Sequence, residues 1–311
     1  MIKVENLVKT FGAKKAVAGV SFTVERGEVL GFLGPNGAGK STTMRMITGF
    51  YPPSSGRVSV GGHDVVESPL EAKRLIGYLP ENAASYPDMS VQGFLAFVAE
   101  MRGLDGGARR NAVHRVVDLC FLGSVLRQSI DTLSKGYRHR TCLAQALIHD
   151  PQVLIMDEPT DGLDPNQKHE VRNLIRELGA SKAIVFSTHI LEEVDAACTR
   201  AIIIDRGKIV ANGTPEELRG MSELAGAVTL QARGATLEKL SSLGRVERLN
   251  GAFRVYPADK SKSGQLAQAV IELVAREGWK VEGMYNEAGQ LDEVFRRITL
   301  PDTVKRDTVK K

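Results

Sequence analysis

The chain has 311 residues, of which 42% are hydrophobic and 25% are charged, and its formal net charge is +4. This composition is typical of a globular protein with one large or two moderate domains, and it excludes a disordered or fibrous chain. No stretch approaches the ~18 consecutive apolar residues of a membrane-spanning helix, and the first residues predict a strand rather than a signal peptide. The three cysteines, Cys120, Cys142 and Cys198, have no metal-ligand spacing and suit a reducing compartment. We therefore expect a cytoplasmic protein.

The surplus of positive charge lies at the end of the chain. Residues 226–311 contain 15 Lys and Arg against 11 Asp and Glu, which accounts for the whole net charge. A nucleic-acid-binding protein usually has a denser basic stripe, so we expect no nucleic-acid partner. Two interpretations of the surplus stay open: an ordinary solvated face, or a mildly basic face toward an anionic membrane.

The first half of the chain predicts strands followed by a helical region. Strands are predicted at residues 2–8, 17–24 and 28–33, and the last of these runs into a glycine-rich turn and a helix. Ser68-Pro69-Leu70-Glu71 has the pattern of a capping box with proline at the first helical position. Residues 87–150 predict helices, with one buried face marked by Val113, Val116, Val117 and Cys120.

Two continuous apolar runs predict a buried parallel sheet. Residues 153–156 and 183–186 lack the alternation of a half-exposed strand, as expected where helices cover both faces of the sheet. A helix is predicted between them, with Asp164 as its cap, Pro165 at its first position and Gly179 closing it. Strands that alternate with helices indicate an α/β core.

A different pattern follows a boundary near residues 219–226. The predicted order is strand, short helix, two strands, helix and strand, which resembles a ferredoxin-like module. Asn250-Gly251 predicts a tight hairpin because both residues tolerate positive φ. A last helix is predicted over residues 291–298, and we expect the charged tail, residues 301–311, to be disordered. The predicted domains are therefore 1–220 and 226–300.

The glycine-rich turn has the phosphate-binding pattern Gly34-Pro35-Asn36-Gly37-Ala38-Gly39-Lys40-Ser41, with a strand before it and a helix after it. Its glycines let successive backbone N–H groups surround phosphates at a helix N-terminus, where the helix dipole favours anions. Lys40 would place a positive charge on the phosphates, and Ser41 would offer its hydroxyl to Mg²⁺. The pattern predicts a nucleoside triphosphate site.

Two acidic residues follow the apolar run 153–156. The carboxyl end of a sheet strand is where a metal-bound nucleotide lies in α/β proteins. Asp157 would hold Mg²⁺ through water, and Glu158 would polarise the attacking water as a general base. Together with the phosphate loop, this pair predicts ATP hydrolysis.

Further motifs make residues 1–220 resemble the ABC ATPases. Leu133-Ser134-Lys135-Gly136-Tyr137 is similar to the family's signature motif, Asp161-Gly162-Leu163-Asp164 to the loop that crosses the dimer, and Ser187-Thr188-His189 to the switch histidine. The resemblance implies an ABC-type P-loop ATPase domain with a mixed sheet core and a helical subdomain; the small α+β module predicted above follows it. It also implies that Phe11 stacks on adenine.

The resemblance assigns a role to each motif residue. The implied catalytic residues are Glu158 and His189. The implied ATP-binding residues are Phe11, Gly34, Pro35, Asn36, Gly37, Ala38, Gly39, Lys40, Ser41 and Thr42. The implied signature residues, which meet the ATP of a second chain, are Ser134, Lys135, Gly136 and Tyr137, and the dimer loop contains Asp161 and Asp164. The implied Mg²⁺ ligands are Ser41, Glu81 and Asp157.

The chain departs from the family pattern at two places. Most members have glutamine where Glu81 stands; a carboxylate still binds a metal but adds a negative charge. The usual Gly-Gly-Gln of the signature is Lys135-Gly136-Tyr137 here, which keeps the hydroxyl of Ser134 and the N–H of Gly136. Both departures put the strength of coupling in doubt rather than the activity itself.

A closer resemblance is to the ATP-binding subunits of ABC-2-type exporters, in particular the gliding-motility-associated branch. It is carried by Leu79-Pro80-Glu81-Asn82, by the Lys-Gly-Tyr form of the signature, and by Leu291-Asp292-Glu293-Val294-Phe295. It implies a homodimer, or a heterodimer with a related ATPase, that closes around two ATP and drives a separate transmembrane permease from the inner face of the membrane.

Three alternatives stay open from the sequence. The chain could be a soluble ABC ATPase that acts on ribosomes or nucleic acid, although these usually have two tandem ATPase units or long coiled-coil insertions. It could be a module that holds ATP without turnover, although Glu158 and His189 are present. The C-terminal module could be a stabilising appendage, or it could govern how two subunits meet or engage the permease.

Overall fold

The computed structural model describes residues 1–82, 85–259 and 263–299, so the predicted tail at 301–311 lies outside the described residues. The chain divides into two compact units, Met1–Asn212 and a second unit that begins at Gly213. This division comes earlier than the boundary expected near residues 219–226. The reason is that α8 (Pro215–Gly220) packs against α11 (Leu291–Ile298), near the end of the described chain.

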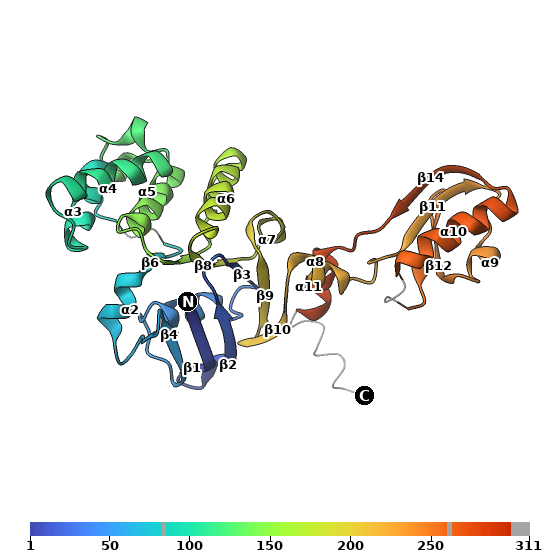
Figure 1. Cartoon of the computed structure of the whole chain (residues 1–311), viewed down its shortest axis with the longest axis horizontal. Helices are drawn as coiled ribbons and strands as arrows, with labels where there is room; N and C mark the ends of the chain where they lie inside the picture. Colours follow the sequence, from blue (N-terminus) through green and yellow to red (C-terminus); the bar gives the residue numbers. More distant parts are fainter. Residues whose placement is uncertain (83–84, 260–262, 300–311) are drawn as a thin grey trace. The chain divides into compact units, whose positions relative to one another are not determined.

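Two sheets form the first unit (Figure 1). In the smaller sheet, β1 (Ile2–Phe11) pairs antiparallel with β2 (Lys14–Val24) and β4 (Ser55–Val60), and β4 pairs with β5 (His63–Asp64). The larger sheet has the order β10-β9-β3-β8-β7-β6, formed by Lys208–Gly213, Arg200–Asp205, Val29–Leu33, Ala183–Thr188, Val153–Asp157 and Ile76–Leu79. Its pairings from β9 to β6 are parallel, which confirms the predicted α/β core.

The position of β7 between two hydrophobic clusters explains why its sequence is apolar without alternation. Leu154 and Met156 belong to a core cluster shared with the helical region, whereas Val153 and Ile155 belong to a second cluster shared with the smaller sheet. All five residues of the strand are buried. Successive side chains of a strand point to opposite faces, so a strand between two cores must be apolar on both.

Seven α-helices of the first unit accompany these sheets within the described residues. They are α1 (Lys40–Ile47), α2 (Pro69–Leu75), α3 (Val91–Met101), α4 (Gly106–Leu119), α5 (Lys135–Leu147), α6 (Pro165–Gly179) and α7 (Leu191–Ala197). Helices α3, α4 and α5 pack on one another and lie together in Figure 1, which confirms the predicted helical region. Its predicted buried face is also confirmed, since Val116, Val117 and Cys120 are buried and Val113 packs beside them. In the described part of the chain, no helix has both the length and the hydropathy needed to cross a membrane.

The structure tests three predicted helix ends. Ser68 is the N-cap of α2 and Pro69 follows it, but the Ser68 side chain makes no capping hydrogen bond, so the predicted capping box is wrong. Gly179 is the last residue of α6, as predicted, although Ala180 is the C-cap and Gly179 does not take a positive φ. A glycine is needed there because a Cβ atom would lie 2.2 Å from Cγ2 of Val29 on β3. The predicted cap Asp164 is confirmed, since its side chain accepts the N–H of Gln167.

The second unit has the predicted ferredoxin-like order. Its elements are β11 (Val228–Arg233), α9 (Leu237–Leu240), β12 (Gly244–Leu249), β13 (Ala252–Pro257), α10 (Ser263–Glu277) and β14 (Lys280–Asn286). The sheet order is β12-β13-β11-β14 with every pairing antiparallel, and α11 follows. The predicted hairpin is confirmed because Leu249 pairs with Ala252, although only Gly251 takes a positive φ, of 79°.

The real capping box lies at the start of α8. Oγ1 of Thr214 accepts the N–H of Glu217 at 3.1 Å, and the carboxylate of Glu217 accepts the N–H of Thr214 at 2.8 Å. Thr236 caps α9 in the same unit without any side-chain bond. Thr214 and Thr236 are therefore both N-cap residues, but only Thr214 makes the side-chain capping hydrogen bond.

We predict that Thr214→Ala lowers the free energy of unfolding of the second unit by about 0.5–2 kcal/mol, because it removes the bond to a helix N–H. Urea unfolding measures this free energy, with the fluorescence of Trp279, the one tryptophan of the chain, as the probe. The Trp279 side chain packs against the core of this unit. Thr236→Ala is the matched control and should change stability less. Equal effects of the two substitutions would contradict the prediction.

Candidate nucleotide site

The phosphate loop connects β3 to α1, and its backbone explains its glycines. Gly37 and Gly39 have φ values of 80° and 109°, in the left-handed region that favours glycine. A Cβ atom at Gly39 would also lie 2.6 Å from the carbonyl oxygen of Ala16 on β2. The loop is therefore held close to a neighbouring strand, with its N–H groups at the start of a helix.

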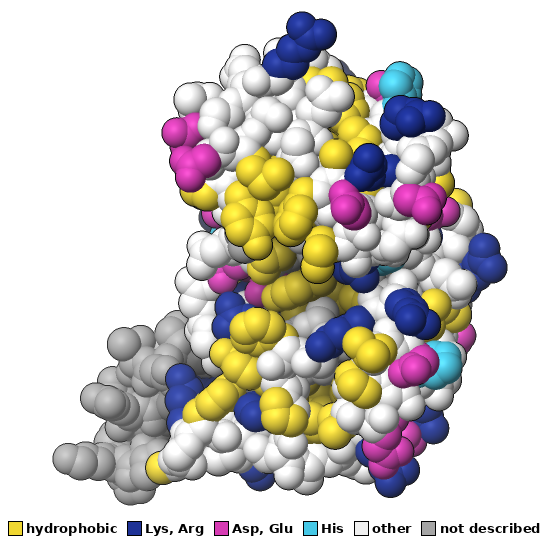
Figure 2. All heavy atoms as spheres, turned by 90° about the vertical axis from the view of Figure 1, so that its left-hand side faces the viewer, with side chains coloured by type: hydrophobic (Ala, Val, Ile, Leu, Met, Phe, Trp, Pro, Cys, Tyr) yellow, Lys and Arg dark blue, Asp and Glu magenta, His cyan; other side chains and the backbone are white. Residues whose placement is uncertain are grey.

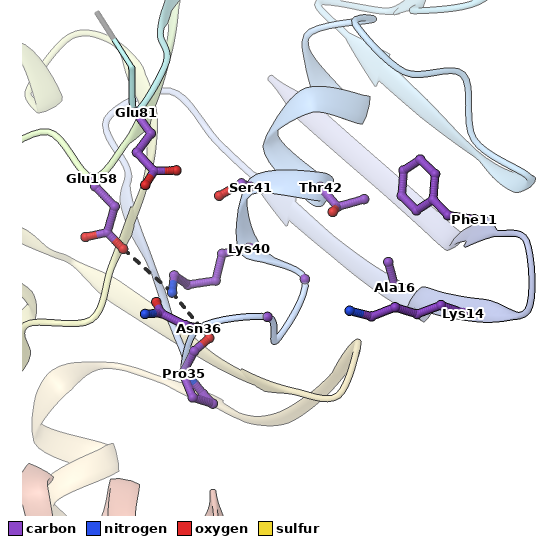
Figure 3. Close-up of a pocket in the computed structure, with 12 residues that line it drawn as sticks. Phe11, Lys14, Ala16, Pro35, Asn36, Lys40, Ser41, Thr42, Glu81 and Glu158 are labelled. Atoms are coloured by element: carbon purple, nitrogen blue, oxygen red, sulfur yellow. Dashed lines mark hydrogen bonds and ion pairs between the residues drawn. The ribbon is translucent and has the colours of Figure 1, made fainter.

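A cavity of about 460 Å³ lies against this loop (Figure 3). Its walls come from β1, β2, the phosphate loop, α1 and the segments after β6 and β7. The lining residues are Phe11, Lys14, Ala16, Pro35, Asn36, Gly37, Gly39, Lys40, Ser41, Thr42, Glu81 and Glu158. The structure therefore brings the predicted aromatic, phosphate-loop and acidic residues to one place. Gly34 and Ala38 belong to the loop but do not line the cavity.

Lys40 is the buried cation of this cavity, with 6% of its surface exposed. Its Nζ donates to the carbonyl oxygens of Gly34 at 2.7 Å and Pro35 at 3.4 Å, and lies 3.6 Å from a carboxylate oxygen of Glu158. Buried charges are costly unless they are paired and hydrogen-bonded. The loop thus holds the ammonium at the cavity wall, where anionic oxygens of a ligand can replace these neighbours.

Asp157 ends β7 and is fully buried. Its Oδ1 accepts hydrogen bonds from the hydroxyls of Ser41, at 3.0 Å, and Ser187. Its Oδ2 is buried and has no hydrogen-bond partner among the described residues. A buried carboxylate oxygen without a donor, next to a serine hydroxyl, is suited to a hard cation such as Mg²⁺ or to its bound water.

Glu158 follows Asp157 and has a left-handed backbone, with φ of 53°, which is unusual for a residue other than glycine. Its N–H donates to the Ser187 hydroxyl at 3.1 Å. One carboxylate oxygen lies 3.6 Å from Lys40, and the other lies 2.9 Å from Nδ1 of His189. Burial raises the pKa of Glu158, and His189 and Lys40 oppose that rise. A carboxylate with a raised pKa, oriented by a histidine, is equipped to accept a proton from water.

The signature residues do not line this cavity. They begin α5, where Oγ of Ser134 accepts the N–H of Tyr137 at 3.4 Å. Nζ of Lys135 donates to the carboxylate of Asp161 at 2.8 Å, and this bond lowers the pKa of Asp161. A Cβ atom at Gly136 would lie 2.5 Å from the side chain of Gln167 on α6. Asp164 caps α6, so the structure gives it a local role.

Sequence reasoning missed four residues of the site. Lys14 and Ala16 line the cavity from β2, and no motif marks them, because the side of a strand that meets a ligand is set by tertiary structure. Thr160 and Glu193 are hydrogen-bonded to each other, and Thr160 lies in the turn that follows Glu158. In the sequence Glu193 follows another glutamate and resembles an ordinary solvated residue, so only its burial identifies it.

These features define a P-loop nucleotide hydrolase: a phosphate loop at a helix N-terminus, a buried carboxylate beside its serine, and a second carboxylate aimed at the cavity. Comparison with known proteins makes the class specific. A family model described as ABC transporter matches residues 17–161.

Two curated relatives extend the match. The linearmycin resistance ATP-binding protein LnrL of Bacillus subtilis (strain 168) is 38% identical over 232 residues, covering 74% of this chain and 74% of the relative. The Nod factor export ATP-binding protein I of a Rhizobium etli strain is 33% identical over 304 residues, covering 96% of this chain and 93% of the relative. A solved ATP-binding subunit of an ABC transporter aligns with a TM-score of 0.66 at 29% identity, covering 77% of this chain and 97% of that one.

The chain therefore belongs to the ABC transporter family of ATP-binding proteins. The predicted fold of the first unit and the predicted class, an ATP-binding and ATP-hydrolysing transporter subunit, are confirmed. The comparisons do not favour the alternative of a soluble ATPase acting on ribosomes or nucleic acid.

We predict that Lys40→Ala abolishes detectable ATP binding while the protein stays folded, because the removed charge faces the phosphate end of the cavity. Fluorescent nucleotide titration measures binding, and circular dichroism measures folding. Lys14→Ala is the matched control, since Lys14 lines the same cavity from β2, on the side of Phe11 (Figure 3). It should weaken binding only slightly. Normal ATP affinity in folded Lys40→Ala protein would overturn the assignment of the phosphate loop.

Proposed function

We propose that this protein is the ATP-hydrolysing subunit of an ABC-2-type exporter of the gliding-motility-associated branch, and that two copies, or one copy and a related ATPase, drive a separate membrane permease. The observation that carries the hydrolytic role is the position of Glu158 at the cavity wall, between Lys40 at 3.6 Å and His189 at 2.9 Å. Export is supported by the relative named for Nod factor export, which matches 96% of this chain.

The residues fit an Mg²⁺ ion bound together with ATP. Oxygen ligands suit this ion, which usually takes one or two carboxylates plus substrate phosphates and waters rather than a cage of protein groups. Asp157 offers an unpartnered buried oxygen, Ser41 its hydroxyl, and Glu81 lines the same cavity. In the described residues no group of three or more His, Cys, Asp or Glu forms a metal site, which agrees with a metal that arrives with the nucleotide. Bound there, Mg²⁺ would neutralise charge on the phosphates.

Hydrolysis then follows from the arrangement of this chain's own groups. The loop N–H groups and Lys40 hold the β- and γ-phosphates. Glu158 accepts a proton from the attacking water, and His189 orients the carboxylate through their 2.9 Å contact. Phe11, which is 44% exposed beside the cavity, offers its ring to the base. Each group acts through its position and its charge, and these two effects provide most of the rate enhancement in phosphoryl transfer.

A second chain completes the site in this proposal. The N-terminus of α5 at Ser134 carries the positive end of a helix dipole, yet no signature residue lines the chain's own cavity. The signature can meet a γ-phosphate only on another subunit. The exposed position of His189, whose side chain is 54% accessible, is compatible with a surface that a partner covers.

An apolar patch on α3 and the segment just before it is the proposed contact with the permease. We define this α3 patch as Tyr86, Phe97 and Met101, which are 57%, 38% and 72% exposed. The rings of Tyr86 and Phe97 are 5.6 Å apart, and Figure 2 shows hydrophobic side chains gathered on the face that includes α3. Exposed apolar patches commonly mark protein contacts. Such docking would place the protein on the cytoplasmic side of the membrane.

We predict that Glu158→Gln slows ATP hydrolysis by about 10²–10⁴-fold, because the amide cannot accept the proton, while ATP affinity is kept. The variant should accumulate as an ATP-dependent dimer in size-exclusion chromatography. Glu192→Gln, on an exposed glutamate of α7, is the control and should hydrolyse ATP normally. A monomer in saturating ATP, with and without the permease, would argue against the two-chain site.

The C-terminal module is proposed to govern how the subunits meet or how they engage the permease. It has its own core, which includes Val228, Leu230, Val255 and Val270, so its fold does not depend on the ATPase core. Contacts between domains of one chain are usually modest and polar, which suits regulation. Because α8 packs against α11, a cut at residue 226 would remove the partner of α8.

We therefore predict that a chain ending at Asn212 still binds ATP with near-normal affinity but differs in self-association or in permease-stimulated ATPase activity. Nucleotide titration, analytical ultracentrifugation and phosphate release with the permease measure the three properties. The variant Thr214→Ala in the full chain controls for loss of the α8 cap alone. No change in any property would leave the module a stabilising appendage, and loss of ATP binding would make it part of the ATPase fold.

A further inference from the structure

Glu193 is a buried carboxylate for which hydrolysis, as described above, has no use. It lies in the first turn of α7, with 1% of its surface exposed, while its neighbour Glu192 is exposed. In the described part of the chain, no Lys, Arg or His lies within ion-pair distance of it. A negative charge near a helix N-terminus is favourable, but Glu192 satisfies that preference from the surface. Burying the carboxylate of Glu193 as well has a desolvation cost, and the helix dipole does not explain it.

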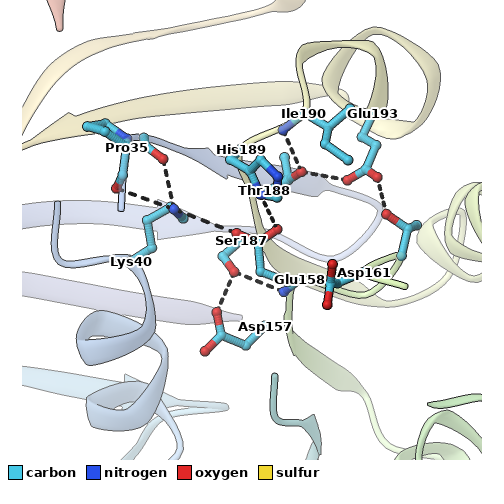
Figure 4. A network of polar contacts seen from close by, with 12 residues as sticks. Pro35, Lys40, Asp157, Glu158, Asp161, Ser187, Thr188, His189, Ile190 and Glu193 are labelled. Carbon is cyan, nitrogen blue, oxygen red and sulfur yellow. Dashed lines mark hydrogen bonds and ion pairs between the residues drawn. The ribbon is translucent and has the colours of Figure 1, made fainter. Parts of the chain in front are cut away.

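The contacts of Glu193 supply that explanation. Its two carboxylate oxygens accept hydrogen bonds from two threonine hydroxyls, Oγ1 of Thr160 and Oγ1 of Thr188, the latter at 2.6 Å. Oγ1 of Thr188 in turn accepts the N–H of Ile190 at 3.0 Å (Figure 4). Both threonines are buried, at 2% and 0% exposure. Hydrogen bonds to a charged group in a dry interior are strong and geometrically restrictive.

The two threonines belong to the two segments that carry the catalytic pair. Thr160 lies in the turn after β7, where the N–H of Asp161 bonds to the carbonyl oxygen of Glu158 at 3.1 Å. Thr188 ends β8 and directly precedes His189. The contact of 2.9 Å between Glu158 and His189 therefore spans two segments that a single carboxylate joins from below.

We propose that Glu193 is a positioning residue that sets the geometry of the Glu158–His189 pair by binding Thr160 and Thr188 at once. This inference rests on the proposed hydrolytic roles of Glu158 and His189. Glu193 does not touch the nucleotide cavity, so its effect reaches the reaction only through those two residues. The same bond to Thr160 also fixes the turn that carries Asp161, the residue paired with Lys135.

The test replaces the carboxylate by an apolar side chain of similar length. Glu193→Met should lower kcat by about 10–100-fold, as small displacements of catalytic groups do, while ATP affinity stays at the wild-type value. Glu192→Met, one position away and exposed, is the matched control and should leave kcat unchanged. In a Glu158→Gln background, Glu193→Met should cause no further loss, because residues that act as a unit are not additive.

The threonines provide an independent pair of measurements. Thr160→Val and Thr188→Val should each lower kcat with ATP affinity kept, whereas Thr160→Ser and Thr188→Ser, which keep the hydroxyl, should retain activity. These variants decide the question if Glu193→Met does not fold. A purely structural role would lower the melting temperature and ATP binding together and would not distinguish serine from valine by kcat.

The outcomes distinguish failure of this inference from failure of the proposed function. A wild-type kcat for Glu193→Met or for both valine variants, together with a slow Glu158→Gln, overturns the positioning role and leaves the hydrolytic assignment intact. A normal kcat for Glu158→Gln overturns the hydrolytic assignment and with it the positioning role. Slow turnover in Glu193→Met and in the valine variants with normal ATP affinity, and rescue by serine, supports the inference.

Discussion

The parallel register of three strands is the constraint on which the nucleotide site depends. Asp157 of β7 is directly opposite Ser187 of β8, and Thr188 of β8 is opposite Leu33 of β3, just before the phosphate loop. The carboxyl ends of parallel strands meet at one edge of the sheet. A shift of this register by one residue would turn each side chain to the other face of the sheet. The buried carboxylate of Asp157, bonded by Ser41 and Ser187, ties the loop and both strands at that edge.

The same edge explains why polar groups accumulate inside an apolar core. The strands are buried on both faces, so their last residues are the first that can carry charge toward the cavity. Glu158 leaves the strand through a left-handed backbone conformation, which turns its side chain away from the path of β7. Such a conformation has an energetic cost that the surrounding bonds must offset. The N–H of Glu158 donates to the hydroxyl of Ser187, and Glu193 accepts a hydrogen bond from Thr160 in the turn that follows; these contacts can offset that cost.

Much of this arrangement could be predicted from the sequence, because it is encoded locally. The apolar run of β7 and the phosphate-loop pattern each depend on adjacent residues. The capping box shows where local patterns fail. Ser68 follows a turn in which Asp64 accepts two backbone N–H groups, and its ψ of 59° lies outside the extended region. Thr214, with ψ of 158°, has the extended backbone that a cap requires.

Contacts between distant segments could not be predicted in this way. Glu193 and Thr160 are 33 positions apart, and their hydrogen bond depends on how α7 packs beside the turn after β7. Nothing in the residues around Glu193 distinguishes it from Glu192. The positions of Lys14 and Ala16 in the cavity likewise depend on how the smaller sheet meets the phosphate loop.

The departure of the signature from the family pattern at Lys135 is compatible with a two-chain site. Lys135 is bonded to Asp161 of its own chain, and both side chains are at least half exposed. Exposed ion pairs of this kind contribute only about 0–1 kcal/mol. The ammonium of Lys135 could therefore exchange the carboxylate for a phosphate oxygen of a nucleotide held by a second chain at little cost. The same exchange would free Asp161 in the loop between Glu158 and α6. In the proposed two-chain site, nucleotide contact at the signature of one chain would therefore alter the segment that follows its own Glu158.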